Sequence, residues 1–132
     1  MSIPILIASI LTLLAFLVHT VVGDRELKLL EPELNGDQQH IVREKWTMAR
    51  SGWHWVSFDL LFATVGLILI NFTDFFENEK TLLQLLSVYF LGYAIVWLIG
   101  IAISKRFPWN YLKLGQWMLL LVISGLIYLG TN

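Results

Sequence analysis

An uninterrupted apolar run reads IPILIASILTLLAFLVHTVV between Ile3 and Val22, and no charged side chain lies within it. A helix needs about 20 apolar residues to cross the ~30 Å hydrocarbon core of a bilayer. Three further runs of this kind cover residues 53–72, 82–104 and 109–129, and Asp59 is the one formal charge well inside any of the four. The four runs predict an all-α integral membrane protein, with residues 1–132 as a single transmembrane domain.

The composition agrees with this interpretation, because 57% of the residues are hydrophobic and only 14% are charged. The formal net charge is −1, so the chain lacks the strongly basic surface that nucleic-acid binding requires. The absence of Cys excludes disulfides, thiolate metal sites and a thiol nucleophile. No phosphate-binding loop or nucleophile elbow is present. We therefore expect no nucleic-acid partner and no catalytic residues, and the expected partner is the lipid bilayer.

Basic residues are divided unevenly between the connections of the four runs. Residues 24–52 and the short link 105–108 fall on one side of the membrane, and eight of the nine Lys and Arg lie on that side, with Lys80 on the other. By the positive-inside rule, residues 24–52 are cytoplasmic and both termini are external. The short later links predict an up-down-up-down four-helix bundle in the bacterial inner (cytoplasmic) membrane.

The cytoplasmic connection, residues 24–52, is predicted to be partly helical. Pro32 is expected to end a short continuation of the first helix. An amphipathic helix over residues 38–50 follows, and we expect it at the level of the lipid headgroups with Trp46 as its anchor. Residues 51–52, Ser and Gly, mark a kink before the second span.

Small and polar residues recur on one face of each of the first two spans. In lipid, where burying one apolar side chain against another gains little, such faces are where helices pack together. We therefore interpret them chiefly as packing seams. The first seam contains Ala8, Thr12, Ala15 and His19, and the second contains Ser57, Thr64 and Asn71.

Two histidines are expected at the same depth in the membrane. His19 lies ~5 Å inside the cytoplasmic end of the first run, and His54 lies at a similar depth inside the second. Asp24 and Arg50 are close to that level. Because ionisable groups in membrane helices are costly, they usually face protein or water and have a partner. His19, His54, Asp24 and Arg50 are therefore the candidate ligand-binding cluster.

Several chemistries fit this cluster. The neutral imidazoles of His19 and His54 are suited to ligate the iron of a b-type haem or a divalent metal ion. Close helix packing beside His19 leaves little room for a macrocycle, and the spacing of the histidines is unlike that of a compact zinc motif. Imidazoles also relay protons near neutral pH. In the structural alternative, both rings only hydrogen-bond to Asp24, a hydroxyl or a carbonyl.

Asp59 is a separate candidate site. It lies ~9 Å into the second run and about 140° around the helix from His54. A carboxylate at that depth must pair, take up a proton or meet water. The third run carries an aromatic face that includes Tyr93. This face either lines a cavity or belongs to the helix core. A Tyr hydroxyl from this face is a candidate donor, so Asp59 and Tyr93 form an alternative ion or proton relay.

The order of motifs resembles a known pattern. His19-Thr-Val-Val-Gly23-Asp24, followed by Arg50-Ser-Gly-Trp53-His54, is similar to a group of small bacterial four-span membrane proteins of uncharacterised function. In that group the first helix ends His-Ser-x-x-Gly-Glu and the second begins Arg-x-x-Trp-His. The Asp and Thr found here keep the same chemistry as Glu and Ser. The resemblance implies that these residues belong to one structural unit, and it brings no activity with it.

These observations predict a polytopic inner-membrane protein whose cytoplasmic-side His, Asp and Arg cluster binds a metal, haem or small ligand, or relays protons. One alternative is a small oligomeric ion channel or a proton-coupled transporter that uses Asp59. A second alternative is an accessory or assembly subunit of a larger membrane complex. An enzymatic role is the least favoured of these interpretations.

Overall fold

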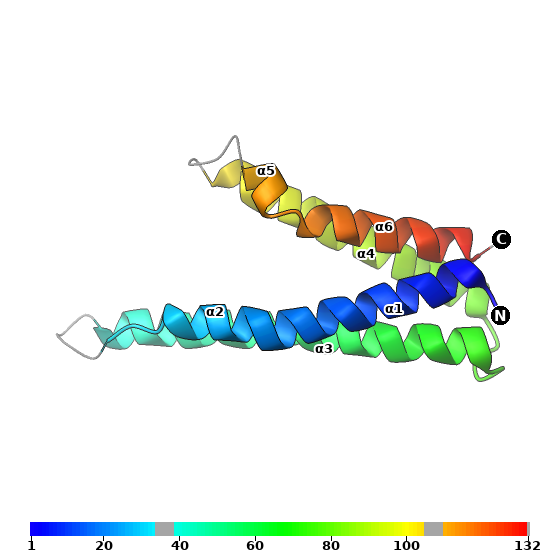
Figure 1. The fold of residues 1–132 in the computed structure, drawn as a ribbon, viewed down its shortest axis with the longest axis horizontal. Coiled ribbons are helices and arrows are strands. Elements are labelled where there is room, and N and C mark those ends of the chain that lie inside the picture. The colour runs from blue at the N-terminus through cyan, green and yellow to red at the C-terminus, as the bar shows by residue number, and fades with distance from the viewer. Residues whose placement is uncertain (34–38, 105–109, 132) are drawn as a thin grey trace. The chain divides into compact units, whose positions relative to one another are not determined.

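The computed structural model describes residues 1–33, 39–104 and 110–131, and within these ranges the chain forms helices and no strands. The all-α prediction is therefore confirmed for the described residues. In chain order (Figure 1) the elements are α1 (Ile3–Val18), the π-helix η1 (His19–Gly23), α2 (Asp24–Leu29), α3 (Gln39–Phe72), α4 (Glu79–Ile103), α5 (Asn110–Lys113) and α6 (Gln116–Leu129).

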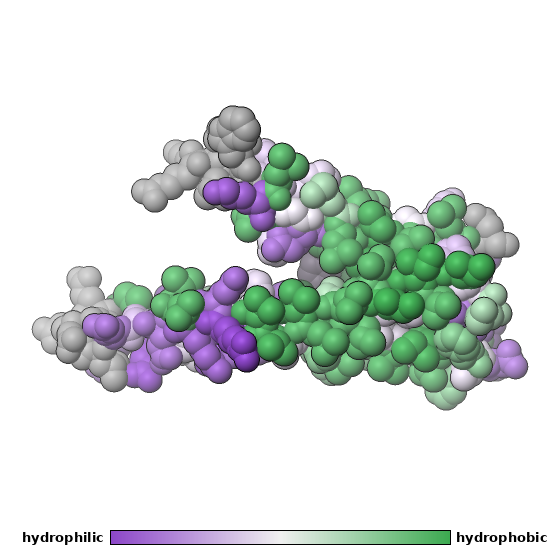
Figure 2. Space-filling view, viewed as in Figure 1, coloured by the Kyte–Doolittle hydropathy of each residue, from purple (hydrophilic) through white to green (hydrophobic). Residues whose placement is uncertain are grey.

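Three helical segments are long and apolar enough to cross a membrane: Ile3–Leu29, His40–Phe72 and Glu79–Ile103. The first of them combines α1, η1 and α2. In Figure 2 apolar side chains cover α1, whereas hydrophilic side chains gather over α2 and the start of α3. This separation of apolar and charged surface along one helical segment is typical of a membrane protein.

The chain divides into two compact units, the first made of residues 1–9 and 66–132 and the second of residues 10–65. α1 and α3 each contribute to both units. All the hydrogen bonds and ion pairs described below join residues of the same unit.

In the first unit α4 packs along α6 (Figure 1). Phe90 of α4 and Ile123 and Ile127 of α6 are fully buried. Two serines join the helices reciprocally: the Ser87 hydroxyl donates to the Ser124 carbonyl at 2.9 Å, and the Ser124 hydroxyl donates to the Ser87 carbonyl at 2.8 Å. Because small side chains let membrane helices approach closely, this pair sets the register of α4 on α6.

In the second unit the chain of α1, η1 and α2 runs antiparallel to α3 (Figure 1). The predicted packing seams are confirmed here. The hydroxyl oxygens of Thr12 and Thr64 lie 2.9 Å apart and both residues are buried, and the Ser57 hydroxyl lies 3.0 Å from Nδ1 of His19. Asn71 belongs to the same row of α3, and in the first unit it accepts a hydrogen bond from the Ser2 backbone N–H at 2.6 Å.

α3 includes the end of the predicted cytoplasmic connection. The helix continues without a boundary through Ser51 and Gly52, and the kink expected there stays a prediction. The Ser51 hydroxyl donates to the Thr47 carbonyl at 2.9 Å, a contact within this helix. The predicted helix over residues 38–50 is therefore the first part of α3, and the preceding turn lies outside the described residues.

The fourth predicted span, residues 109–129, is corrected. It is divided into α5 and the 14-residue α6 by a turn at Leu114 and Gly115. A Cβ at Gly115 would lie 2.9 Å from the Met118 methyl group, so the turn accommodates glycine where larger residues would crowd Met118. The Trp97 indole N–H donates to the Leu114 carbonyl at 3.2 Å and satisfies an acceptor that the end of α5 leaves without a helical partner.

The aromatic face of α4 consists of side chains that contact one another. The rings of Tyr89 and Tyr93 meet edge to face at 4.9 Å between centroids, and their hydroxyl oxygens are 3.1 Å apart. These contacts are those of a packed helix surface. The alternative that this face lines a cavity stays a prediction.

Candidate functional site: a histidine, aspartate and arginine cluster

The π-helix η1 is the element that positions the first half of the site. π-helices are rare single-turn insertions in α-helices and are frequent at functional sites. η1 begins at His19 and ends at Gly23, and it lies within the motif His-x-x-x-Gly-Asp. Gly23 is buried, and a Cβ built on it would overlap the indole of Trp53. Glycine at this position therefore lets the Trp53 ring lie directly against the backbone of η1.

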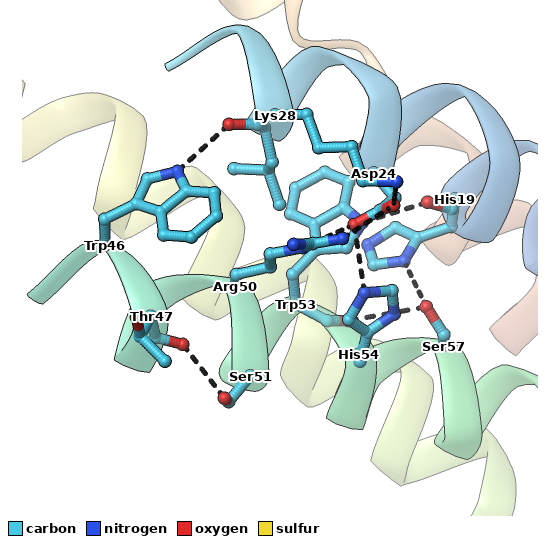
Figure 3. Close-up of polar contacts among 11 residues, drawn as sticks. His19, Asp24, Lys28, Trp46, Thr47, Arg50, Ser51, Trp53, His54 and Ser57 are labelled. Atoms are coloured by element: carbon cyan, nitrogen blue, oxygen red, sulfur yellow. Dashed lines mark hydrogen bonds and ion pairs between the residues drawn. The ribbon is translucent and has the colours of Figure 1, made fainter. Parts of the chain in front are cut away.

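Trp53 holds His19 in two ways. Its indole N–H donates to the backbone carbonyl of His19 at 2.9 Å, and its ring stacks on the imidazole with 3.9 Å between centroids and 6° between planes. The imidazole Nδ1 lies 3.0 Å from the Ser57 hydroxyl (Figure 3). Three contacts from one turn of α3 thus fix the position and the orientation of the His19 ring.

Asp24, the first residue of α2, is the centre of the charged part of the cluster (Figure 3). Arg50 donates to both of its carboxylate oxygens, from Nε at 2.7 Å and from a terminal nitrogen at 3.0 Å. Lys28 Nζ lies 3.1 Å from one of these oxygens, and His54 Nε2 lies 3.1 Å from the other. The Asp24 side chain is 14% exposed, so its carboxylate is almost enclosed by these three partners.

Asp24 and Arg50 lie outside the apolar runs 3–22 and 53–72. The hydrogen bonds from Arg50 hold the pKa of the Asp24 carboxyl well below its usual range, and Lys28 and His54 act in the same direction. The carboxylate in turn raises the pKa of the Arg50 guanidinium. The two groups are therefore a fixed charge pair.

Two further contacts extend the cluster away from the apolar runs. The Arg50 guanidinium lies over the Trp46 ring, 5.4 Å from its centroid, and the Trp46 indole N–H donates to the Leu27 carbonyl at 3.0 Å. Trp46 therefore attaches α2 to α3, whereas the sequence predicted that it anchors a helix in the headgroups. Arg43 and Glu31 form a weaker pair at 3.7 Å between half-exposed side chains.

The structure brings all four residues of the predicted cluster, His19, Asp24, Arg50 and His54, into one unit. Sequence reasoning missed two of their partners. Ser57 was assigned only to a packing seam, and Lys28 was not named, although its position four residues after Asp24 is the spacing of a helical ion pair.

The other candidate residues lie elsewhere. Asp59 is half-buried on α3 in the second unit, and Tyr93 belongs to α4 in the first unit. The relay that links Asp59 with Tyr93, the transporter that would use it and the assembly subunit remain predictions.

The donor set does not favour a metal ion or haem. Over residues 1–33, 39–104 and 110–131, no group of three or more His, Asp or Glu side chains is arranged to hold a metal ion. The ring nitrogens of the two histidines that face the cluster are in contact with Ser57 and Asp24. A metal bound by both imidazoles would have to displace these partners. The predictions of haem and of a divalent metal are therefore unsupported.

Over the described residues, fold and site together define an all-helical chain with helices of membrane-spanning length and a polar cluster between η1, α2 and the interior of α3. Comparisons with protein-family models, with curated proteins and with solved structures find no match. The function of the cluster is therefore inferred from its own chemistry.

Proposed function

We propose that this chain is a four-span protein of the bacterial inner membrane, with both termini external, and that it belongs to the small four-span group its motif resembles. Three helical segments of spanning length support the membrane location. The fourth span would consist of α5, the turn at Leu114 and the apolar α6 together. The excess of basic residues in residues 24–52 supports the orientation.

We propose further that the cluster takes up and releases protons at the cytoplasmic end of the first two spans. One observation carries this proposal: His54 Nε2 lies 3.1 Å from the Asp24 carboxylate while 41% of the His54 side chain is exposed. The ring is thus accessible from outside the chain on one side and in contact with a permanent negative charge on the other. A proton on Nε2 would lie within hydrogen-bond distance of the Asp24 carboxylate.

The second imidazole makes the site a coupled pair. A positive charge on His54 disfavours a positive charge on His19, because like charges in one cluster repel each other. In this proposal the cluster therefore carries one added proton at a time. Ser57, which contacts His19 Nδ1, is a hydroxyl that both donates and accepts, so it allows either tautomer of that ring.

The test is nuclear magnetic resonance of the detergent-purified protein with ¹⁵N-labelled histidine rings. The chain has three histidines, so each ring is assigned from a single His→Gln variant, and the exposed His40 is an internal reference. Between pH 5 and 8, we expect Asp24→Asn to make His54 bind its proton less readily. We expect His54→Gln to make His19 bind its proton more readily, with the His40 titration unchanged in both variants.

Independent titrations would contradict the proposal. If His19 responds to pH identically with and without His54, the imidazoles are not coupled. If Asp24→Asn leaves the His54 titration unchanged while the His19 contacts persist, the carboxylate does not stabilise the proton. In either case the cluster has a purely structural role.

A further inference from the structure

Lys28 is the partner of Asp24 to which the proton-binding proposal gives no role. Its ammonium Nζ lies 3.1 Å from Oδ2 of the Asp24 carboxylate, one turn away on the same helix α2 (Figure 3). Arg50 donates to both oxygens of that carboxylate, and His54 Nε2 lies 3.1 Å from Oδ1. Arg50 thus contacts both oxygens, whereas Lys28 and His54 each contact a different one.

The two permanent cations of the cluster are held to different degrees. Arg50 makes two hydrogen bonds to Asp24, at 2.7 and 3.0 Å, and its guanidinium also lies over the Trp46 ring. Lys28 reaches the carboxylate through one ammonium group at the end of a flexible stem. The Lys28 side chain is 56% exposed, against 29% for Arg50, and exposed ion pairs contribute little to stability. Lys28 is therefore the cation that leaves Asp24 more easily.

Charge determines which partners Asp24 keeps when His54 gains a proton. With a neutral His54 ring, the single negative charge of Asp24 faces two positive charges, those of Arg50 and Lys28. A charged His54 ring adds a third. The Asp24 carboxylate favours this added charge, whereas Lys28 on α2, Arg50 on α3 and any charge on His19 of η1 oppose it. Departure of Lys28 removes part of this repulsion and leaves the hydrogen bonds of Arg50 intact.

We propose that Lys28 sets the proton affinity of the cluster, because it competes with a charged His54 ring for the Asp24 carboxylate. This inference rests on the proposed function. A proton from outside the chain forms an N–H bond on the His54 ring, and Nε2 donates to Oδ1 of Asp24. Lys28 keeps its own protons and carries its positive charge away from Oδ2. Loss of the proton from His54 reverses both changes, so Asp24 faces two positive charges in each state.

The first test measures proton binding by His54 in the full chain, purified in detergent, from the resonances of ¹⁵N-labelled histidine rings. Lys28→Met removes the competing charge and keeps an unbranched side chain. We expect it to move the midpoint of the His54 titration to higher pH by about 0.5 unit, roughly a threefold gain in proton affinity. Lys28→Arg keeps the charge, so its His54 midpoint should equal that of the unmodified chain.

Lys45→Met is the matched control, because Lys45 is an exposed lysine of α3 that is not a partner of Asp24. It removes the same charge from the same compact unit and should leave the His54 midpoint unchanged. If Lys45→Met shifts the midpoint as far as Lys28→Met does, the total charge of the unit is responsible and the proposal is wrong. An unchanged midpoint in Lys28→Met overturns it as well.

The second test follows Lys28 itself. With ¹⁵N-labelled lysine side chains, the ammonium resonance of Lys28 is assigned from its loss in Lys28→Met. We expect this resonance to change with pH at the midpoint of the His54 ring, and to be constant between about pH 5 and 8 in His54→Gln. A Lys28 resonance that stays constant while His54 titrates would mean that Lys28 remains on Asp24, contrary to the proposed competition.

These outcomes distinguish the role of Lys28 from the proposed function. If Asp24→Asn weakens proton binding by His54 and Lys28→Met leaves it unchanged, the proton site stands and Lys28 has only a structural role. If Asp24→Asn has no effect on His54, the proton site fails, and competition at Asp24 fails with it. In each variant, persistence of the Trp53 ring on His19 shows that the unit remains folded.

Discussion

At the scale of single residues, Gly23 determines whether the cluster can assemble. The Trp53 indole occupies the space that a Cβ at this position would need, and the same indole carries both the stacking on His19 and the hydrogen bond to its carbonyl. We expect Gly23→Ala to displace the ring and lower the free energy of unfolding in detergent by about 1–3 kcal/mol, the usual cost of overpacking. Chemical denaturation followed by circular dichroism measures this change.

Gly52→Ala is the control for Gly23→Ala. A Cβ at Gly52 meets no atom within 4 Å, and the residue lies inside the continuous helix α3. Replacing a glycine within a helix by alanine stabilises it by up to ~1 kcal/mol. If Gly23→Ala lowers the free energy of unfolding no more than Gly52→Ala does, the Trp53 ring moves aside without cost. The packing argument would then fail.

Asp24 shows why a residue type alone does not reveal its role. From the sequence it was one of several polar groups near two histidines. In the folded chain the Asp24 carboxylate contacts three side chains. Arg50 and His54 come from α3, and Lys28 comes from its own helix α2. Its charge is thereby satisfied by protein groups.

At the scale of helices, α3 is long enough to extend through two environments. Its 34 residues extend ~51 Å at 1.5 Å per residue, whereas the hydrocarbon core is ~30 Å thick. If the apolar run 53–72 spans the core, the residues before Gly52 extend beyond it. α2 pairs with this part through Trp46 and Arg50, so protein contacts stabilise the charged end of the unit.

The contact of α4 with α6 depends on the reciprocal hydrogen bonds of Ser87 and Ser124. We expect Ser87→Ala and Ser124→Ala each to lower the free energy of unfolding by about 0.6–2 kcal/mol, the range for polar contacts between membrane helices. The double variant should lose less than the sum of the two, because each single change already breaks part of one pair.

Ser51→Ala provides the comparison for the serine pair. Its hydroxyl donates to the Thr47 carbonyl of its own helix and is exposed, so its removal should change stability by less than about 0.5 kcal/mol. Strictly additive effects of the Ser87 and Ser124 substitutions would mean that the two hydroxyls act separately, contrary to the geometry.

At the scale of the whole molecule, the proposed orientation in the membrane depends on the distribution of charge. The chain contains no Cys, so an introduced cysteine is the single thiol and reports on one site. With a membrane-impermeant maleimide on intact cells, we expect Asn78→Cys to react and Glu44→Cys to react only after permeabilisation, because most basic residues lie in residues 24–52. Both positions are exposed. If Glu44→Cys reacts on intact cells and Asn78→Cys reacts only after permeabilisation, the topology is the opposite of the one proposed.

The sequence by itself determined the helical class and the three long apolar segments, because the length and hydrophobicity of a run are local properties that a bilayer requires. It also indicated which polar faces pack, since Thr12, His19, Ser57 and Thr64 recur at helical spacing. The proximity of His19, Asp24, Arg50 and His54 followed from placing two antiparallel helices at a common depth.

Only the tertiary structure decided the remaining features. The π-helix, the place of Trp53 against Gly23 and the enclosure of Asp24 depend on residues 19–28 meeting residues 46–57, which no local pattern contains. The division of the fourth span depends on Trp97 of α4 reaching the Leu114 carbonyl. Local hydrophobicity defines where a helix can form, whereas contacts between distant segments decide where its hydrogen-bond pattern changes and which polar groups are paired.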